Sequence, residues 1–504
     1  MIKGYRVLYN QDSSHLFYVT KEPITPSHVD RMVDEAADGG ADLMLINPNC
    51  QRTSYPGRAW QTYWEGYEEG SRSFFGPVPE KTIPARDHAI SQKKRLADSG
   101  CDYLDRALAR CRDKGIGAGV SIRMNDTHDT PWAGSHLLSS FFSENTQWHI
   151  EIETGYGGDY SRIYCLDYGQ NEVREHYLSL ISEIISGYDP DVLELDFMRY
   201  PRYFRKGSEY EGRHIMTEFV ADVRRLLPSG RYLIVRVPAT PKASYDMGLD
   251  TGSWAGKKLI DGIVPSAHFV TAWNADIKGY REAAGPDVCI YPSADSAVSW
   301  IEGLAPPSAK NDITDHVMGF DERFLYGFAS ACYAQGADGI YLFNFFCARE
   351  WKRRDPKFEI IGNIKNVSDL ACRSRSYSIM SPGSAFSVPE ADGPVQVPCD
   401  MAPGETGCFD MAVARETCSE DVRVEVIFNK GQQNHPVKLK IVLNGHLLQE
   451  LAGYEAVDPN MCKMSFEAAQ DMLCDGNNSI GIKNGPGKIR VCSIEIHTKG
   501  CGGK

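Results

Sequence analysis

Short apolar runs alternate with amphipathic segments along the first three quarters of the chain. The run at 5–10 ends in polar residues, and the segment from Thr25 to Gly40 then has helical apolar spacing, an early proline and a closing glycine pair. A second apolar run, at 41–47, again turns polar at its end. Runs that are this short and apolar throughout indicate strands buried on both faces. The pattern therefore predicts βα units of a parallel sheet.

The same unit recurs along the chain. Six further apolar runs, each ending in polar or aromatic residues, lie at 116–128, 191–196, 232–238, 261–269, 288–295 and 339–345. Helical spacing separates them, with one long helix expected at 91–114. Eight such units predict closure into a (β/α)8 TIM-type barrel over residues 1–368. An open doubly wound sheet is disfavoured because no glycine-rich phosphate loop follows the first strand.

The pattern changes after about residue 369. Apolar and polar residues alternate with a period of two at 422–428, 437–443 and 489–497, which is typical of half-buried antiparallel strands. Asn444-Gly445 is a hairpin-turn signal. We therefore expect residues 369–504 to form a second domain, a jelly-roll-like all-β sandwich.

Composition narrows the classes of partner. The 504 residues carry a net charge of −13, which argues against nucleic acid as a partner. No apolar run reaches the length of about 18 residues that a membrane span needs. The start shows no signal-peptide pattern, but a removed export signal leaves no trace. A secreted or periplasmic location and a cytoplasmic one both stay open, and the sequence does not indicate an oligomeric state.

The fifteen cysteines are unevenly spread, with eight of them between 372 and 501. No CxxC pair occurs, which disfavours a zinc site of closely spaced thiolates. The C-terminal group could form disulfides if the protein is exported. No metal and no cofactor is expected.

The strand at 191–201 carries the most informative pattern. Glu194 and Asp196 lie two residues apart and share one face, whereas Leu193 and Leu195 face the other way. Buried carboxylates are costly unless they are paired or used. The carboxyl ends of barrel strands are where ligands bind, so Asp196 is expected at that rim. We interpret the pair as catalytic rather than as a structural partner of Arg199 or Arg236.

The other strand ends add a set of polar and aromatic side chains. Amides and guanidinium groups pair well with hydroxyls, and aromatic rings stack on the apolar faces of sugars, so the set predicts a carbohydrate site. The predicted catalytic residues are Asp196, Glu194, Asp295 and Asp126. The predicted substrate-binding residues are Asn47, Trp60, Trp64, Arg123, Asn125, His128, Arg199, Tyr200, Arg236, His268, Tyr291 and Asn344.

Several of these stretches resemble a known family. Asp191-Val-Leu-Glu-Leu-Asp-Phe-Met-Arg-Tyr-Pro201, with the segments at 248–254, 259–265 and 339–344, resembles bacterial glycoside-hydrolase-like barrel proteins over most of residues 1–365. The segments at 442–448 and 475–482 resemble galactose-binding-like jelly rolls appended to carbohydrate enzymes. The resemblance implies that Asp196 is the nucleophile. This chain departs from related hydrolases because no glutamate ends strands five to eight.

Cleavage of a glycosidic bond needs a carboxylic acid and a second carboxylate. Asp196 suits the carboxylate, while Glu194, one pleat deeper, suits orientation of Asp196 or of an arginine. The acid is sought among Asp295, Asp126, Asp250 and Glu350, in that order. We predict a glycoside hydrolase acting on a polysaccharide or oligosaccharide, an anionic one if Arg199 and Arg236 bind a sulfate or carboxylate.

Two alternatives belong to other classes. A non-catalytic carbohydrate-binding protein on a degenerate barrel is compatible with the missing glutamate. A metal-dependent hydrolase could use His128 and His268 with Asp126. Trp60 and Trp64 could equally be a sugar platform or core beneath a long loop.

Overall fold

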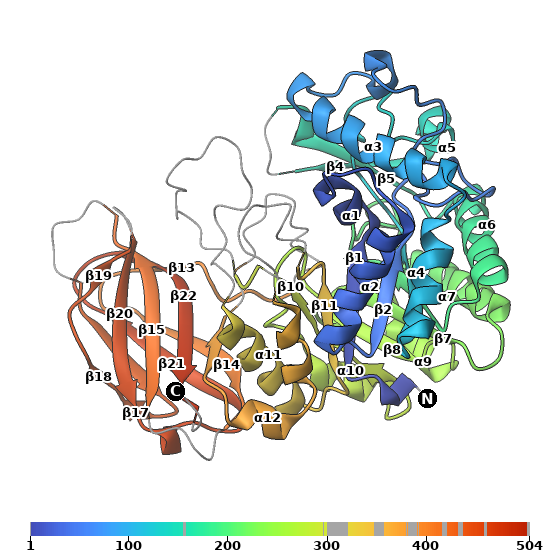
Figure 1. Ribbon diagram of the computed structural model, residues 1–504. Coiled ribbons are helices and arrows are strands. Elements are labelled where there is room, and N and C mark those ends of the chain that lie inside the picture. Colours follow the sequence, from blue (N-terminus) through green and yellow to red (C-terminus); the bar gives the residue numbers. More distant parts are fainter. Residues whose placement is uncertain are drawn as a thin grey trace.

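The computed structural model describes most of the chain, and two bodies stand side by side in it, a barrel and a β-sandwich (Figure 1). The described residues are 2–154, 158–295, 297–299, 321–346, 357–379, 381, 391, 393–415, 421–431, 437–457 and 461–500.

The barrel strands run parallel, and each is hydrogen-bonded to its neighbour in chain order. Their bounds are β1 Val7–Asp12, β2 Leu43–Asn47, β3 Gly117–Arg123, β6 Val192–Asp196, β7 Tyr232–Pro238, β8 Gly262–Ser266, β9 Cys289–Ile290, β10 Ser293–Asp295 and β11 Ile340–Phe343. Every one of these strands is buried along most or all of its length, as the unbroken apolar runs predict.

The ring closes through a strand made of two pieces. β9 pairs with β8 and β10 pairs with β11, while β11 pairs with β1. Between β9 and β10, Tyr291 N donates to Ile263 O at 2.9 Å, and Tyr341 N donates to Pro292 O at 3.0 Å. Because β9 and β10 thus act as one strand, the nine named segments form eight strands, and the predicted (β/α)8 barrel is confirmed.

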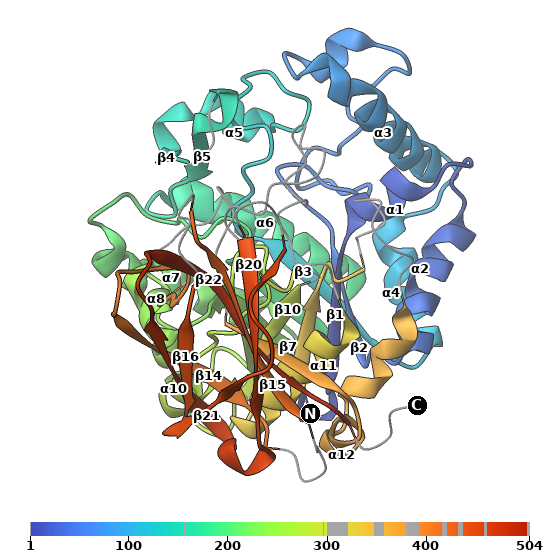
Figure 2. The same ribbon diagram turned by 90° about the vertical axis from the view of Figure 1, so that its left-hand side faces the viewer.

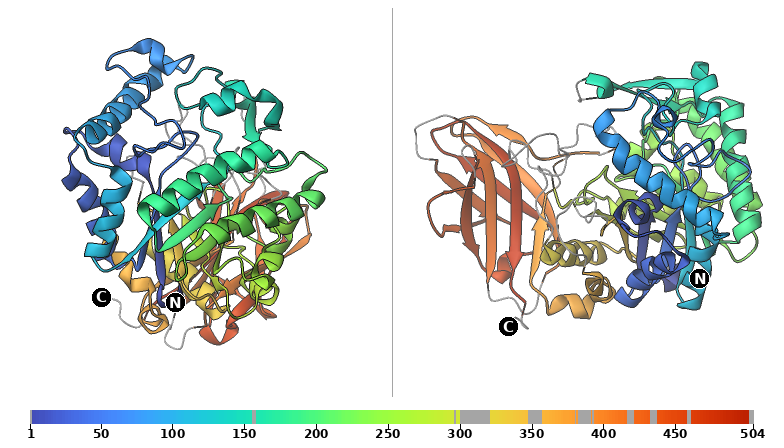
Figure 3. Two further views of the ribbon diagram at one scale, coloured as in Figure 1. Left: turned by 90° about the vertical axis from the view of Figure 1, so that its right-hand side faces the viewer. Right: turned by 45° about the horizontal axis from the view of Figure 1, so that its top comes forward.

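Helices surround the ring on its outside (Figure 3). The longer ones are α2 Pro26–Gly39, α3 Ile83–Asp98, α4 Tyr103–Asp113, α6 Asn171–Tyr188, α7 Glu209–Leu226, α10 Ile277–Ala284 and α11 Glu322–Ala334. The shorter ones are α1 Ser13–Val19, α8 Pro241–Asp246, α9 Thr251–Gly256 and α12 Val367–Ala371.

The single helix expected at 91–114 is wrong. Gly100 has a φ of +79°, which ends α3, and the Asp102 carboxylate accepts from Leu104 N at 2.8 Å and so caps a new helix, α4. The apolar spacing continues across this break, which is why the pattern alone predicted one helix.

Long connections after β2 and β3 build a lobe over one end of the barrel. The second connection contains α5 Ser140–Glu144 and an antiparallel pair, β4 His149–Glu153 with β5 Arg162–Leu166. This lobe is at the top right of Figure 1. Because both connections leave the carboxyl ends of their strands, the lobe stands beside the rim where the sequence predicts a site.

The barrel lumen changes character along its axis. Its amino end is filled by apolar side chains such as Leu8, Val192 and Ile234. Towards the carboxyl end the register aligns polar side chains on neighbouring strands: Ser121 pairs with Glu194, Arg123 with Asp196, and Asp196 with Arg236. Charged groups thus occupy the upper lumen as one layer.

The C-terminal region forms two packed antiparallel sheets, so the predicted sandwich is also confirmed (Figure 2). One sheet contains β12 Arg375–Ser378, β13 Cys399–Met401, β15 Val422–Asn429, β18 Gln449–Glu450, β19 Glu455–Ala456, β20 Met461–Ala468 and β22 Ile489–Thr498. The other contains β14 Thr406–Val413, β16 Leu439–Leu443, β17 His446–Leu447 and β21 Gly476–Asn484. Asn444 and Gly445, between β16 and β17, have φ values of 49° and 88°, as the predicted hairpin turn requires.

The twelve described cysteines are all free thiols, so no disulfide forms among them. The remaining three, Cys347, Cys418 and Cys501, lie outside the described residues. No helix in the described part of the chain is long and apolar enough to cross a membrane.

Candidate active site

Asp196 ends β6 in the upper lumen, where it forms an ion pair with Arg236. Arg236 Nη1 lies 3.0 and 3.2 Å from the two carboxylate oxygens, and Met198 N donates to Oδ1 at 2.9 Å. The guanidinium is held in turn by Ser266 Oγ at 3.1 Å and by the Phe343 ring, 3.8 Å away. Both members of the pair are almost fully buried. The Asp196 carboxylate is therefore fixed in orientation.

Glu194 lies one pleat below Asp196 on the same strand. Its Oε1 accepts from Ser121 Oγ at 2.5 Å and from Tyr341 Oη at 2.8 Å. Burial, and then the charge of Asp196, raise the pKa of Glu194 to about 8. The raised pKa favours the protonated form of Glu194 at neutral pH, and a neutral Glu194 does not compete with Asp196 for Arg236.

A second group of charges lies on the β1 and β3 side of the lumen. Arg123 contacts Asp12, and its Nη1 donates to Asp126 Oδ2 at 2.9 Å. The other oxygen of Asp126 accepts from His128 N at 2.9 Å and contacts His128 Nδ1 at 2.7 Å. Burial alone would raise the pKa of Asp126, but His128, Arg123 and Arg199 outweigh it and hold that pKa well below its usual range. Asp126 is a permanent carboxylate.

Arg199 connects the two groups from the loop after β6. Its Nη2 lies 3.4 Å from His128 Nε2, and its Nε lies 4.0 Å from Asp126 Oδ2. The guanidinium faces the Phe269 ring at 4.9 Å, and the Arg199 carbonyl oxygen contacts His268 Nε2 at 3.2 Å. Arg199 is 5% exposed.

Among the aspartates and arginines of this cluster, the charges balance when Glu194 is neutral; His128 and Lys93 lie beside them. Three carboxylates face three guanidinium groups: Asp12, Asp126 and Asp196 against Arg123, Arg199 and Arg236. Balance explains how so many charges can be buried together, since an unpaired buried charge is strongly destabilising.

The charged groups of the cluster are paired, but some of its buried polar atoms make no hydrogen bond. Several buried polar atoms in or beside the cluster have no hydrogen-bond partner among the described residues, including Asn10 Oδ1, Gln51 Oε1, Glu194 Oε2 and Arg199 Nε. Buried polar groups in native proteins are nearly always paired, so each exception needs a reason. A polar ligand that completes these bonds is such a reason.

Three predicted binding residues brace the backbone around this cluster. Asn47 Nδ2 donates to Ser121 O at 2.9 Å. Asn125 Nδ2 donates to Leu166 O and to Arg202 O, at 3.1 and 2.7 Å. Asn344 Oδ1 accepts from Asp12 N at 2.9 Å. These side chains hold strand ends and loops together, and their amides are largely used in doing so.

Four predicted aromatic residues lie apart from the charged cluster or at its border. Tyr291 Oη donates to Ile2 O, at the amino end of the lumen. The indole of Trp60 stacks on His176 of α6 and donates to its carbonyl oxygen at 3.0 Å. Trp64 packs with Tyr67, Phe75 and their neighbours in the lobe. Tyr200 is buried, with its ring 5.6 Å from that of His268.

The acid candidates differ in their surroundings. Asp295 ends β10 and pairs in register with Phe343, whose ring lies over Arg236 in the lumen. Its carboxylate accepts from Ala297 N at 3.0 Å. The Asp250 carboxylate caps α9 by accepting from Ser253 N. Glu350 lies outside the described residues.

Some partners in the site were not predicted. Ser121 and Tyr341, which hold Glu194, come from β3 and β11 and give no local signal. Lys93 was missed because a lysine in an amphipathic helix indicates a solvated face. It is buried between the rings of Phe17 and Tyr63, 4.1 and 4.7 Å away, and burial lowers its pKa to about 7.

The two histidines proposed as metal ligands do not suit a cation. The Arg199 guanidinium lies 3.4 Å from His128 Nε2 and would repel a metal ion bound there, and His268 Nε2 is engaged by the Arg199 carbonyl oxygen at 3.2 Å. His128 Nδ1 is already engaged with Asp126. The residues present therefore do not fit the metal-dependent alternative.

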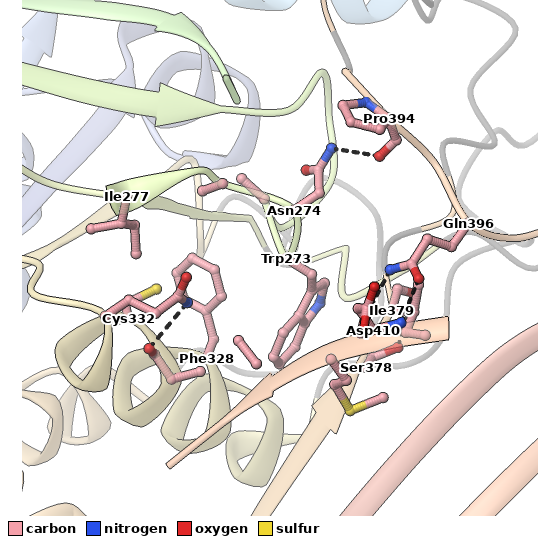
Figure 4. A pocket seen from close by; sticks show the side chains of 16 residues that line it. Trp273, Asn274, Ile277, Phe328, Cys332, Ser378, Ile379, Pro394, Gln396 and Asp410 are labelled. Carbon is pink, nitrogen blue, oxygen red and sulfur yellow. Dashed lines mark hydrogen bonds between the residues drawn. The ribbon is translucent and has the colours of Figure 1, made fainter. Parts of the chain in front are cut away.

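Two cavities lie away from these charges. One, between the loop after β8, helix α11 and the sandwich, encloses about 30 Å³, which is room for only one or two waters (Figure 4). Asn274 and Gln396 line it, and Gln396 exchanges hydrogen bonds with the Asp410 backbone. The other, of about 560 Å³, is an open cleft in the lobe next to Trp148 and Arg205. Neither contains a predicted catalytic residue.

No protein-family model matches the chain, and no curated protein matches it. Among solved structures, it is similar to an alpha-amylase from Geobacillus thermoleovorans complexed with acarbose, at 12% identity and a TM-score of 0.39, over 95% of this chain and 98% of that one. An Anoxybacillus alpha-amylase shows 11% identity and a TM-score of 0.40, over 96% and 99%.

A cycloisomaltooligosaccharide glucanotransferase from Paenibacillus sp. shows 8% identity and a TM-score of 0.34, over 98% of this chain. This chain spans only 57% of the length of that protein. Similarity at this level transfers no activity, and the assignment of the barrel rests on its own strand order and register.

Proposed function

We propose that the protein is a glycoside hydrolase whose substrate enters the upper lumen of the barrel and meets Asp196. The observation that carries the proposal is the pair of carboxyl groups on β6. Asp196 is fixed by Arg236, and Glu194 beneath it holds a proton. Environments that push neighbouring carboxyl groups into different protonation states are a recurring feature of glycosidase sites.

In this proposal Asp196 is the carboxylate that attacks or stabilises the reacting sugar carbon. Asp295, on a lumen-facing position of β10, is the acid that protonates the leaving oxygen. Glu194 is a positioning residue, because it lies deeper and its neutral form keeps Arg236 on Asp196. Asp126 is not the acid, since a group held so firmly as a carboxylate has no proton to give.

Unpartnered atoms support a hydroxyl-rich substrate. The side-chain oxygens of Asn10 and Gln51 are acceptors without a donor. Sugar hydroxyls would supply those donors and complete the network. The substrate class is therefore an oligosaccharide or polysaccharide.

The test is a glycan screen with matched variants. Purified protein is incubated with a panel of oligosaccharides, and new reducing ends are measured. Asp196→Glu keeps the negative charge beside Arg236 but displaces the carboxylate by about one bond, so turnover should fall by at least about 100-fold. Asp246→Asn, at an exposed surface ion pair, should have no effect. Full turnover by Asp196→Glu would remove Asp196 from the mechanism.

A non-catalytic sugar-binding protein is the second candidate. It is favoured by one observation: Asp196 is 1% exposed and both of its oxygens accept from Arg236. A carboxylate that is buried and paired in this way is less accessible to a reacting sugar carbon. Binding of a glycan without turnover, with the same affinity in wild type and Asp196→Glu, would establish this function in place of hydrolysis.

A further inference from the structure

Arg199 is the arginine of the upper lumen whose hydrogen-bonding capacity is least used. A guanidinium has five N–H donors. Arg199 reaches His128 Nε2 only at 3.4 Å, and its Nε has no partner although the residue is nine-tenths buried or more. Arg123 and Arg236, by contrast, each have a carboxylate oxygen within 3.0 Å.

The nearest carboxylate, that of Asp126, does not accept hydrogen bonds from the unused N–H donors of Arg199. Asp126 Oδ2 lies 4.0 Å from Arg199 Nε but already accepts from Arg123 Nη1 at 2.9 Å. Asp126 Oδ1 accepts from the backbone N–H of His128 and contacts its ring nitrogen. Asp126 therefore contributes attraction at long range and leaves the donors of Arg199 without a close acceptor.

The surroundings of Arg199 suit an incoming anion. The Phe269 ring lies 4.9 Å from the guanidinium carbon and limits its movement. At the edge of the guanidinium is His128, whose side chain is 43% exposed, so this edge opens to solvent. A planar donor group held against a ring and open at one edge is the geometry that binds carboxylates and sulfates bidentately.

We propose that Arg199, with His128 beside it, binds an anionic substituent of the substrate, so that the substrate is an acidic glycan carrying a uronate carboxylate or a sulfate ester. This inference rests on the proposed glycan site. Arg199 follows Asp196, the last residue of β6, by three residues, so an anion held by Arg199 sets the position of the sugar ring relative to Asp196. Arg199 is thus a specificity residue of that site.

The test measures binding separately from turnover. Methyl glucuronide and galactose 6-sulfate are compared with methyl glucoside and galactose by calorimetry at low salt, in wild type and in Asp196→Asn. Each anionic sugar that fits should bind about 10–100-fold more tightly than its neutral counterpart, the factor typical of a charged hydrogen bond. Arg199→Gln should abolish the preference, and Arg199→Lys should restore part of it. Arg205→Gln, in the same loop but paired with Asp167 at 3.0 Å, is the matched control and should bind as wild type does.

The outcomes separate this inference from the proposed function. A preference for one anionic sugar over the other identifies carboxylate or sulfate as the group bound. Equal binding of neutral and anionic sugars, or a preference that survives Arg199→Gln, overturns the inference while hydrolysis can still be observed. An anion preference lost in Arg199→Gln, without turnover of any glycan, supports the inference and overturns the proposed hydrolase. Melting curves of both Arg199 variants show whether each is folded.

Discussion

Two buried clusters of charge can be compared in this protein, one in the barrel lumen and one on the sandwich. The second consists of Glu425 on β15 and Glu495 and His497 on β22. His497 Nε2 lies 3.1 Å from Glu495 and 3.6 Å from Glu425, and its Nδ1 contacts Ser376 Oγ at 2.8 Å. Glu425 also attracts Lys463, 3.3 Å away.

The sandwich cluster is paired at close range: His497 Nε2 has no well-aligned hydrogen bond, but it lies 3.1 Å from a Glu495 oxygen. Burial would lower the pKa of His497, but the two glutamates outweigh it and raise that pKa to about 9. Burial likewise opposes the ionisation of Glu425, but His497 and Lys463 lower its pKa to about 2. The three side chains could in principle hold a metal ion, yet a protonated histidine and a lysine already supply the positive charge. The cluster is an ion-pair network next to helix α11, where Phe324 packs against His497.

The difference lies in what each cluster leaves unused. In the sandwich cluster His497 Nε2 lies 3.1 Å from a carboxylate oxygen, whereas in the lumen Arg199 Nε lies 4.0 Å from the nearest one. The lumen also contains buried acceptors of Asn10 and Gln51 that have no donor. A cluster whose charges are in close contact adds stability and specificity of packing, whereas one with unused donors and acceptors has capacity for a ligand. Buried charge alone therefore does not mark a site, and the following predictions test the distinction.

The largest expected difference concerns turnover. Asp196→Asn should abolish hydrolysis of any glycan that the wild type cleaves, because an amide can neither attack nor stabilise the sugar carbon. Glu425→Gln removes a carboxylate from the sandwich cluster and should leave turnover per folded molecule unchanged. Rates of reducing-end release, normalised to folded protein by circular dichroism, provide the measurement. A loss of turnover in Glu425→Gln would contradict the distinction between a functional cluster in the lumen and a structural cluster on the sandwich.

The next effect concerns stability. Arg236→Met leaves the Asp196 charge buried without its partner, so the free energy of unfolding should fall by about 3–5 kcal/mol. Arg423, 3.7 Å from Glu425, has a side chain that is 58% exposed, and Arg423→Met should cost less than about 1 kcal/mol. Chemical denaturation of both variants measures the difference. Similar decreases in the free energy of unfolding for the two variants would show that the two clusters contribute equally to stability.

The next prediction concerns the pH dependence of the free energy of unfolding, which should reveal whether Glu194 is protonated in the folded protein. Its pKa is raised to about 8, so the fold retains a proton that the unfolded chain releases near pH 4.5. Stability from this group is full below about pH 4.5 and is lost as pH rises through about 8, by on the order of 5 kcal/mol. Glu194→Gln should remove this loss, and unfolding measured from pH 5 to 9 should have a flatter profile. An unchanged profile would show that Glu194 is ionised.

The smallest effect is expected at His497. Its raised pKa means that its contribution is full below about pH 6.5 and is lost as pH rises through about 9. His497→Gln should therefore lower the free energy of unfolding by about 2 kcal/mol at pH 6 and by much less at pH 10. Thermal melts at the two pH values test this. An equal loss at both would mean that packing against Phe324, rather than charge, is what His497 contributes.

The fold could be predicted from the sequence because its signals are local. Each barrel strand is an apolar run with a polar end, and each sandwich strand alternates with a period of two. The error at 91–114 arose where apolar spacing continued through Gly100, a residue whose left-handed conformation is not encoded by periodicity.

The site could be predicted only in part. Strand ends identified Asp196, Arg123 and Arg236, because the carboxyl ends of parallel strands meet in space. Residues in the long loops could not be placed this way: Trp60 packs on α6, far away in the sequence. Partners such as Tyr341 were missed because a hydrogen bond across the lumen depends on register, which no single strand reveals.

The seventh barrel strand is divided into β9 and β10, so we expect the side of the lumen that carries Asp295 to be more deformable than the side that carries Asp196. Asp196 lies on β6, a continuous strand that pairs with β3 and β7 along its full length. Asp295 is the third and last residue of β10, which begins after Pro292, so its strand is interrupted rather than continuous. If the proposed sugar binds between Asp196 and Asp295, we expect the interrupted strand to adjust its position while the strand that carries Asp196 keeps its shape.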